Sequence, residues 1–437
     1  MDDLKITNGA VYMNGDFYQV NVYIKDGRIS ALTKDARDSK DTYDANGSMI
    51  LPGFIDPHVH FSLEVGSHKT ADDFESGSRA AAYGGVTTFV DFLEPTATVD
   101  ALEKAFEKRK EEAKDSTLDY KFHATMKAPD DSLESYIKAM RRMGLDTLKV
   151  FTTYSDSGRR TEDEAVRELI RLTVPERFLL LAHIENDELI NLNKDFTYED
   201  LPKSRPSESE TVEALKLADF VKETGGRLYM VHLSSGHTLK ALKHKHSDIL
   251  NTSLFVESCP QYFMFRRDCL HKKNGHLYTC APPLRSMMEQ HYLRNHFDDI
   301  HTIGTDHAPF MKSEKDNPLL KDIPLGLGSI EHTFNVLYHL KGTSVIDKMT
   351  KNPAKRMGLF PKKGILKVGS DGDIAIVKLR TPYKIKANHS ACDYSLYEGL
   401  EVSTEIVSTI SRGRFVIKDG IFTKQKGEFL RGEGIDD

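Results

Sequence analysis

The sequence predicts an α/β fold, a (β/α)8 TIM barrel that carries a small β-sandwich domain formed by the N- and C-terminal segments. Three observations predict it. Short apolar strands alternate with amphipathic helical stretches from residue 51 onward, this alternation supplies eight strands, and strand-rich segments lie before and after it. The expected boundaries are 51–359 for the barrel and 1–50 with 360–437 for the discontinuous β domain.

Both ends of the chain have the pattern of short strands separated by tight turns. Asn14-Gly15, Asp26-Gly27 and Asp419-Gly420 are pairs that favour hairpin turns. Because chain termini often lie close together, the two strand-rich ends are expected to pair into one domain. The expected strands are 4–6, 17–24, 29–32, 373–377, 405–410 and 414–417.

The middle of the chain supplies the barrel. Its expected strands are 53–58, 87–92, 120–125, 147–151, 178–183, 227–232, 254–258 and 301–306. Its expected helices are 71–83, 99–114, 132–143, 162–172, 207–224, 237–247, 287–297, 329–340 and 344–356. A doubly wound open sheet is the alternative, but no GxGxxG motif follows any of these strands to support dinucleotide binding.

Composition narrows the class of function. A formal net charge of −6 gives no basic footprint for nucleic acid. No apolar run approaches the ~18 residues of a membrane span, and the N-terminus lacks the features of a signal peptide, so we expect a cytoplasmic protein without a membrane partner. The four cysteines show no CxxC spacing, which argues against a disulfide framework or a thiolate metal site.

A His-x-His motif ends the first expected barrel strand. Side chains two residues apart on a strand share a face, so His58 and His60 point the same way. They lie at the carboxyl end of the strand, where barrel active sites are found, and paired neutral imidazoles suit zinc. On its own, a His-x-His motif is weak evidence for a metal site, because such histidines often have only a structural role.

Four more polar residues lie at the ends of later strands, namely Lys149, His183, His232 and Asp306. Any one of them could be an ordinary hydrogen-bonded residue. Because the carboxyl ends of barrel strands meet at one rim, together they predict a single site.

Lys149 is the most informative of these residues, because a buried ammonium is costly unless it is paired. A neutral lysine can react with carbon dioxide or bicarbonate to give N6-carboxylysine, an anionic carbamate whose two oxygens can bridge two metal ions. The alternative is a salt bridge between Lys149 and a nearby acid such as Glu185.

The ordered set of motifs resembles the cyclic amidohydrolases, which include dihydropyrimidinase, hydantoinase, allantoinase and dihydroorotase. The resemblance extends over nearly the whole chain. It is carried by residues 51–60, 70–75, 84–88, 148–151, 183–186, 231–235, 257–262, 281–285, 304–309 and 393–399.

The resemblance implies two divalent metal ions and a role for each polar strand end. One metal would be held by His58, His60, carboxylated Lys149 and Asp306, and the other by Lys149, His183 and His232. A bridging hydroxide would attack the ring, and Asp306 would act as general base and then as general acid. Imidazole and carbamate ligands favour zinc and leave manganese, iron and cobalt open.

The resemblance also names the expected substrate contacts, which are Tyr154, Ser258, Ala281 and Leu325. A tyrosine at the position of Tyr154 points at the developing oxyanion in hydantoinases and dihydropyrimidinases; an ordinary loop tyrosine is the alternative. Ala281 stands where hydantoinases commonly have serine, and Leu325 where they commonly have asparagine, so the pocket should be less polar.

A small-molecule cyclic ureide or imide is therefore the expected substrate, opened by a hydantoinase- or dihydropyrimidinase-like enzyme. Dihydroorotases usually carry an arginine at the position of Ser62, so that activity ranks low, and an allantoinase-like activity is the other alternative. A non-enzymatic scaffold of the same fold is the alternative from a different class. The resemblance further implies a homotetramer or homodimer.

Overall fold

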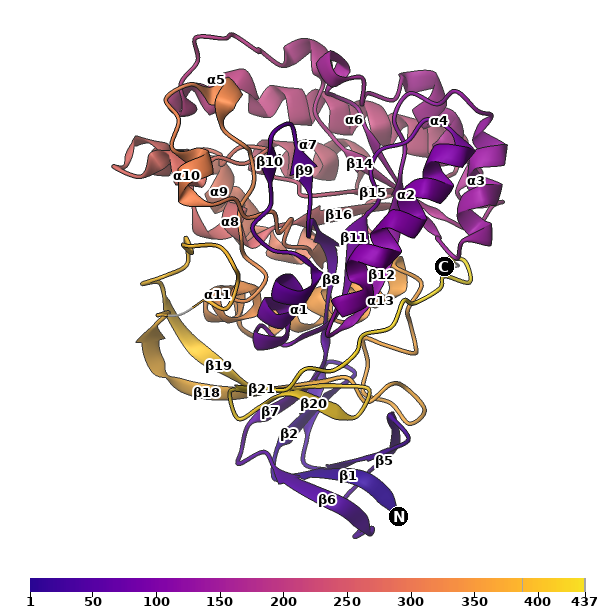
Figure 1. Cartoon of the computed structure of the whole chain (residues 1–437), viewed down its shortest axis with the longest axis vertical. Coiled ribbons are helices and arrows are strands. Elements are labelled where there is room, and N and C mark those ends of the chain that lie inside the picture. Colours follow the sequence, from indigo (N-terminus) through magenta and orange to yellow (C-terminus); the bar gives the residue numbers. More distant parts are fainter. Residues whose placement is uncertain (387, 436–437) are drawn as a thin grey trace.

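The structure is a computed structural model that describes residues 1–386 and 388–435. Figure 1 shows a barrel surrounded by helices, joined to a smaller β region in which N-terminal and C-terminal strands lie together. The predicted (β/α)8 barrel with its accompanying β-rich terminal segments is confirmed.

The barrel consists of eight parallel strands in the sheet order β17-β16-β15-β14-β13-β12-β11-β8. Parallel pairing of Val59 with His307, together with the 2.9 Å bond from the Asp306 amide to the His58 carbonyl, joins the first strand to the last. The strands are β8 (Phe54–Val59), β11 (Val86–Phe92), β12 (Asp119–Thr125), β13 (Thr147–Phe151), β14 (Leu179–His183), β15 (Leu228–Met230), β16 (Leu254–Ser258) and β17 (Thr302–Ile303).

Helices cover the outside of the barrel, as the alternating pattern predicts. Short polar side chains fix where several of them begin: Asp73 closes a capping box, and Thr98 and Ser132 accept amide hydrogen bonds. The principal helices are α1 (Phe74–Tyr83), α2 (Val99–Glu112), α3 (Leu133–Arg142), α4 (Asp163–Leu172), α6 (Ser207–Thr224), α7 (Gly236–His246), α9 (Met287–Asn295), α11 (Thr333–Lys341) and α13 (Lys351–Arg356).

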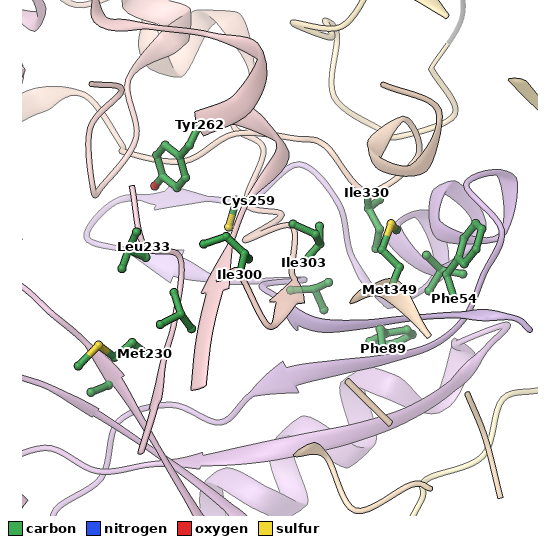
Figure 2. Close-up of a cluster of buried hydrophobic side chains, with 14 of the residues drawn as sticks. Phe54, Phe89, Met230, Leu233, Cys259, Tyr262, Ile300, Ile303, Ile330 and Met349 are labelled. Carbon is green, nitrogen blue, oxygen red and sulfur yellow. The ribbon is translucent and has the colours of Figure 1, made fainter. Parts of the chain in front are cut away.

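Alternate side chains of each barrel strand face two different apolar cores. On β14, Leu180 and Ala182 belong to the core between the strands and the helices, whereas Leu179 and Leu181 belong to the core inside the barrel. Figure 2 shows part of the outer core. Since Lys149 pairs in register with Leu181, it shares the inward face and closes the inner core at the carboxyl end.

The β region contains two sheets, in the orders β5-β4-β1-β6 and β21-β20-β19-β18-β7-β2-β3. One apolar cluster, which includes Val22 from the first sheet and Ile50 and Ile376 from the second, joins them. The strands are β1 (Asp2–Thr7), β2 (Ala10–Met13), β3 (Asp16–Tyr18), β4 (Asn21–Lys25), β5 (Arg28–Thr33), β6 (Ser39–Asp44), β7 (Met49–Pro52), β18 (Ile374–Lys384), β19 (Glu401–Ser411), β20 (Arg414–Lys418) and β21 (Ile421–Phe422).

The final segment, 424–435, leaves these sheets and runs under the amino ends of the barrel strands. Tyr120 at the start of β12 exchanges backbone hydrogen bonds with Glu428 and Leu430, and the Ile435 amide bonds to the Arg177 carbonyl just before β14. This segment therefore closes the end of the barrel opposite the predicted site. The exact domain boundaries stay a prediction.

Candidate active site

His58, His60 and Asp306 meet at the carboxyl ends of β8 and β17. The Oδ1 atom of Asp306 lies 3.2 Å from His58 Nε2 and 3.1 Å from His60 Nε2. One nitrogen or oxygen from each residue falls within 4.8 Å of the others, which is a spacing that could hold a metal ion. Burial lowers the pKa of His60 to about 4, so its imidazole is neutral and can donate a lone pair.

Lys149 lies on the inner face of β13 and is 2% exposed. Its Nζ atom is 5.3 Å from the ring centre of Phe92 and 5.4 Å from that of Phe151. Among the described residues, no carboxylate lies within ion-pair distance of it, and Glu185 instead pairs with Arg205. Burial lowers the pKa of Lys149 to about 8. The neutral amine, which is the form that reacts with carbon dioxide, is therefore more populated near neutral pH than in an ordinary lysine.

His183 and His232 complete the cluster. Their ring centres are 4.6 Å apart, and the His232 ring is 5.4 Å from that of His58. Burial lowers the pKa of both imidazoles, which keeps them neutral. Within the part of the chain that the structure describes, the buried Nδ1 atoms of His60 and His232 find no hydrogen-bond partner. Orphaned nitrogens beside a lysine and a carboxylate form a donor set that fits divalent metal ions.

The backbone around this cluster is unusual. Tyr154, His232 and Asp306 have φ angles of 69°, 40° and 52°, in the left-handed region that such residues seldom adopt. The last two lie just beyond β15 and β17, which explains why those strands end earlier than 232 and 306, where the sequence predicts their ends. Strain of this kind is concentrated at functional sites.

Of the expected substrate contacts, Tyr154 lies beside the cluster, with its ring centre 5.3 Å from that of His183. The Ser258 hydroxyl donates to the Leu233 carbonyl at 2.7 Å and is buried. Ala281 and Leu325 are partly exposed, and their loops are joined by a 3.2 Å bond from the Gly326 amide to the Thr279 carbonyl.

Sequence reasoning missed Glu257, the residue before Ser258. One of its oxygens lies 2.7 Å from His58 Nδ1, and the other accepts from the Tyr229 hydroxyl at 2.8 Å. It orients the His58 ring so that Nε2 faces Asp306. The presence of a charged residue in a wholly buried strand is the signal by which Glu257 could have been identified.

The profile of the Amidohydrolase family matches residues 49–416. The chain belongs to this family. This amidohydrolase is 32% identical to D-hydantoinase from Geobacillus stearothermophilus, over 97% of this chain and 94% of the relative. It is 30% identical to D-phenylhydantoinase from Escherichia coli O81 (strain ED1a), over 98% and 97% of the two chains.

Solved structures agree with the sequence relatives. A crystal structure of D-hydantoinase superposes with a TM-score of 0.93 at 31% identity, over 99% of each chain. The dihydropyrimidinase from Brevibacillus agri NCHU1002 superposes with a TM-score of 0.92 at 27% identity, over 100% of each chain. In the described part of this amidohydrolase, no helix has the length and apolar character of a membrane span.

Proposed function

We propose that this amidohydrolase opens the amide bond of a cyclic ureide or imide, as a hydantoinase- or dihydropyrimidinase-like enzyme. The observation that carries the proposal is the convergence of four buried or partly buried imidazoles, Lys149 and Asp306 at one rim of the barrel. The full-length similarity to D-hydantoinase, D-phenylhydantoinase and dihydropyrimidinase supports this class of substrate.

The donor set suits two divalent metal ions, for which zinc is our first choice. His58, His60 and Asp306 would hold one ion, His183 and His232 the other, and Lys149 carboxylated by carbon dioxide or bicarbonate would bridge them. When bound, such ions lower the pKa of water and polarise a carbonyl.

The protein's own groups perform the proton transfers. Asp306, which faces both His58 and His60, would accept the proton of the attacking water and return it to the leaving ring nitrogen. The Tyr154 phenol would donate a hydrogen bond to the oxygen on which charge develops, a contact that stabilises a transition state by about 2–4 kcal/mol in other enzymes.

The pocket loops favour a ring with an apolar substituent. Ala281 and Leu325 place a methyl and an isobutyl group where hydantoinases commonly carry hydroxyl and amide groups. The main-chain groups at these two positions would still contact the ring, and Ser258 would contact it as well. The buried Ser62 stands where dihydroorotases usually carry an arginine. A dihydroorotate carboxylate would therefore lack the arginine that is expected to bind it. We also propose a homotetramer or homodimer, to be measured by light scattering, and a cytoplasmic location.

The test is metal content together with hydrolysis of dihydrouracil, hydantoin, 5-phenylhydantoin, allantoin and dihydroorotate. We expect about two metals per chain and ring opening in the natural protein. Lys149→Ala should abolish both, whereas Lys127→Ala, an exposed lysine just beyond β12, should change neither. A protein that binds no metal and opens no ring, even with zinc and bicarbonate supplied, would refute the proposal and favour a scaffold role.

A further inference from the structure

Arg205 lies beside the proposed site, although it belongs to none of the motifs that supply the proposed metal ligands. It precedes α6 and is 5% exposed. Its guanidinium carbon is 4.7 Å from the ring centre of Tyr154, and its Nη1 atom donates to Glu185 Oε2 at 2.5 Å. The same Glu185 oxygen lies 2.7 Å from His183 Nε2. One cation thus contacts both the phenol and the carboxylate beside a proposed metal ligand.

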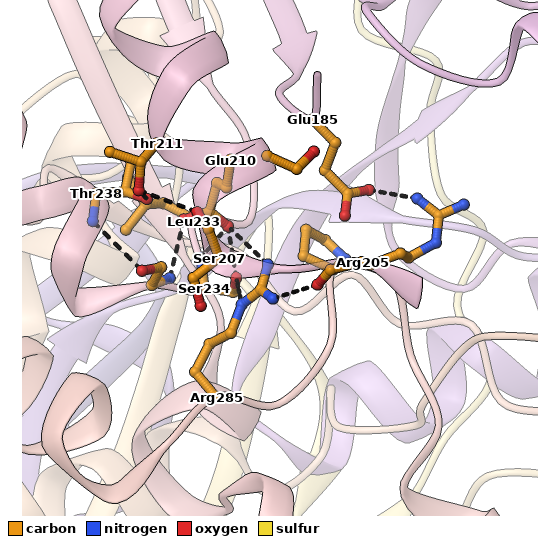
Figure 3. A network of polar contacts seen from close by, with 12 residues as sticks. Glu185, Arg205, Ser207, Glu210, Thr211, Leu233, Ser234, Thr238 and Arg285 are labelled. Atoms are coloured by element: carbon orange, nitrogen blue, oxygen red, sulfur yellow. Dashed lines mark hydrogen bonds and ion pairs between the residues drawn. The ribbon is translucent and has the colours of Figure 1, made fainter. Parts of the chain in front are cut away.

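The position of Arg205 is itself fixed by a buried polar network, which Figure 3 shows. The carbonyl of Arg205 accepts a 2.6 Å hydrogen bond from Arg285 Nη1, and Arg285 Nε donates to the Ser234 hydroxyl at 2.8 Å. The Ser234 amide in turn donates to Glu210 on α6 at 3.0 Å. Since buried networks restrict the groups they join, this network fixes the backbone of Arg205, and the bond to Glu185 then holds its guanidinium against the tyrosine ring.

A fixed guanidinium has two consequences for Tyr154. Packing on the ring face holds the phenol in place, although its backbone is in the left-handed region. The positive charge also favours negative charge on the phenol oxygen and makes it a stronger hydrogen-bond donor. Burial raises the pKa of Tyr154, and Arg205 opposes this rise.

We propose that Arg205 is a positioning residue for ring opening, which holds and polarises the Tyr154 phenol and braces His183 through Glu185. This inference rests on the proposed function, because it needs Tyr154 to contact the developing oxyanion. A lysine would keep the charge but lack the flat face that stacks on the ring. We therefore expect both the planarity and the charge of arginine to matter at this position.

The test is a double-mutant cycle on metal-saturated enzyme with 5-phenylhydantoin, using Arg205→Met, Tyr154→Phe and the combination. We expect Arg205→Met to lower kcat by about 10- to 100-fold with a smaller change in KM. In the Tyr154→Phe background the same change should cost much less. Arg167→Met removes an exposed arginine on α4 whose guanidinium also lies over an aromatic ring, that of Phe220, and is the matched control; it should leave kcat near the natural value.

Equal losses from Arg205→Met in both backgrounds, or no loss at all, would overturn the inference while the proposed function stands. If Arg205→Met does not fold, Arg205→Lys is used in its place. A kcat of Arg205→Lys equal to that of the natural enzyme would refute the need for a planar cation. A natural enzyme that opens no ring despite bound metal would instead refute the proposed function, and the inference with it.

Discussion

Replacing Lys315 with methionine tests how the loops around the proposed pocket are held together. Lys315 is completely buried, and its ammonium donates to the Thr279 carbonyl at 2.7 Å, the Thr279 hydroxyl at 3.1 Å and the Gly326 carbonyl at 2.7 Å. These neutral acceptors belong to the loops that carry Ala281 and Leu325. Burial, with no carboxylate of the described residues paired to it, lowers the pKa of Lys315 from 10.5 to about 7.

The pKa shift of Lys315 sets the size and the sign of the effect. Between pH 7 and 10.5 the unfolded chain binds the lysine proton more tightly than the folded chain, so stability rises with pH across this window. The slope is about 1.4 kcal/mol per pH unit, which gives about 2 kcal/mol between about pH 7.5 and about pH 9. Lys315→Met lacks this contribution.

Urea unfolding of both proteins, stripped of metal, at the two pH values is the assay. We expect the stability of the natural protein minus that of Lys315→Met to increase by about 2 kcal/mol at the higher pH. Lys104→Met is the control, because Lys104 lies on the surface beside Asp100 and its difference should stay flat. A flat difference for Lys315→Met as well would show that the buried amine titrates normally, and would refute the reasoning.

Three more changes test other parts of the structure. Lys363→Met should lower the free energy of unfolding by about 3–5 kcal/mol in urea titrations, because it removes the buried ammonium that pairs with Asp119, Asp371 and Asp373; an unchanged midpoint would contradict this. Gly427→Ala would put a methyl group 1.8 Å from the Leu118 carbonyl, so the segment 424–435 should detach and trypsin should cut it faster than in the natural protein. Leu325→Asn should raise kcat/KM for dihydrouracil relative to 5-phenylhydantoin; an unchanged ratio would remove Leu325 from the substrate contacts.

Much of the fold could be predicted because strands and helices alternate with clear periodicity. The expected helices 162–172 and 207–224 differ from α4 and α6 by at most one residue. Irregular parts were predicted less well. The expected strand 17–24 divides into β3 and β4, and the strands β6 and β7 were missed, because β6 is mostly exposed and polar and β7 is very short.

The polar residues at the strand ends could be predicted because the geometry of a barrel brings the ends of its strands to one rim, independently of the conformation of the loops. Their supporting residues could not. Glu257 contacts His58 across 199 positions of sequence, and Arg285 reaches Arg205 across 80. Contacts of this length depend on the three-dimensional path of several loops, which no local pattern records.

The left-handed residues explain how the strand ends become a site. A strand that stayed regular through His232 and Asp306 would continue to alternate its side chains, whereas the left-handed turn redirects each one at the barrel mouth. Each such residue costs about 1–3 kcal/mol and persists only where its surroundings hold it. Glu257 accepts the His232 amide at 3.0 Å, and the His58 carbonyl accepts the Asp306 amide at 2.9 Å. The groups that hold the strained backbone thus include Glu257, which orients His58, and His58 itself, one of the proposed metal ligands. Positioning and strain compensation are therefore performed by the same residues.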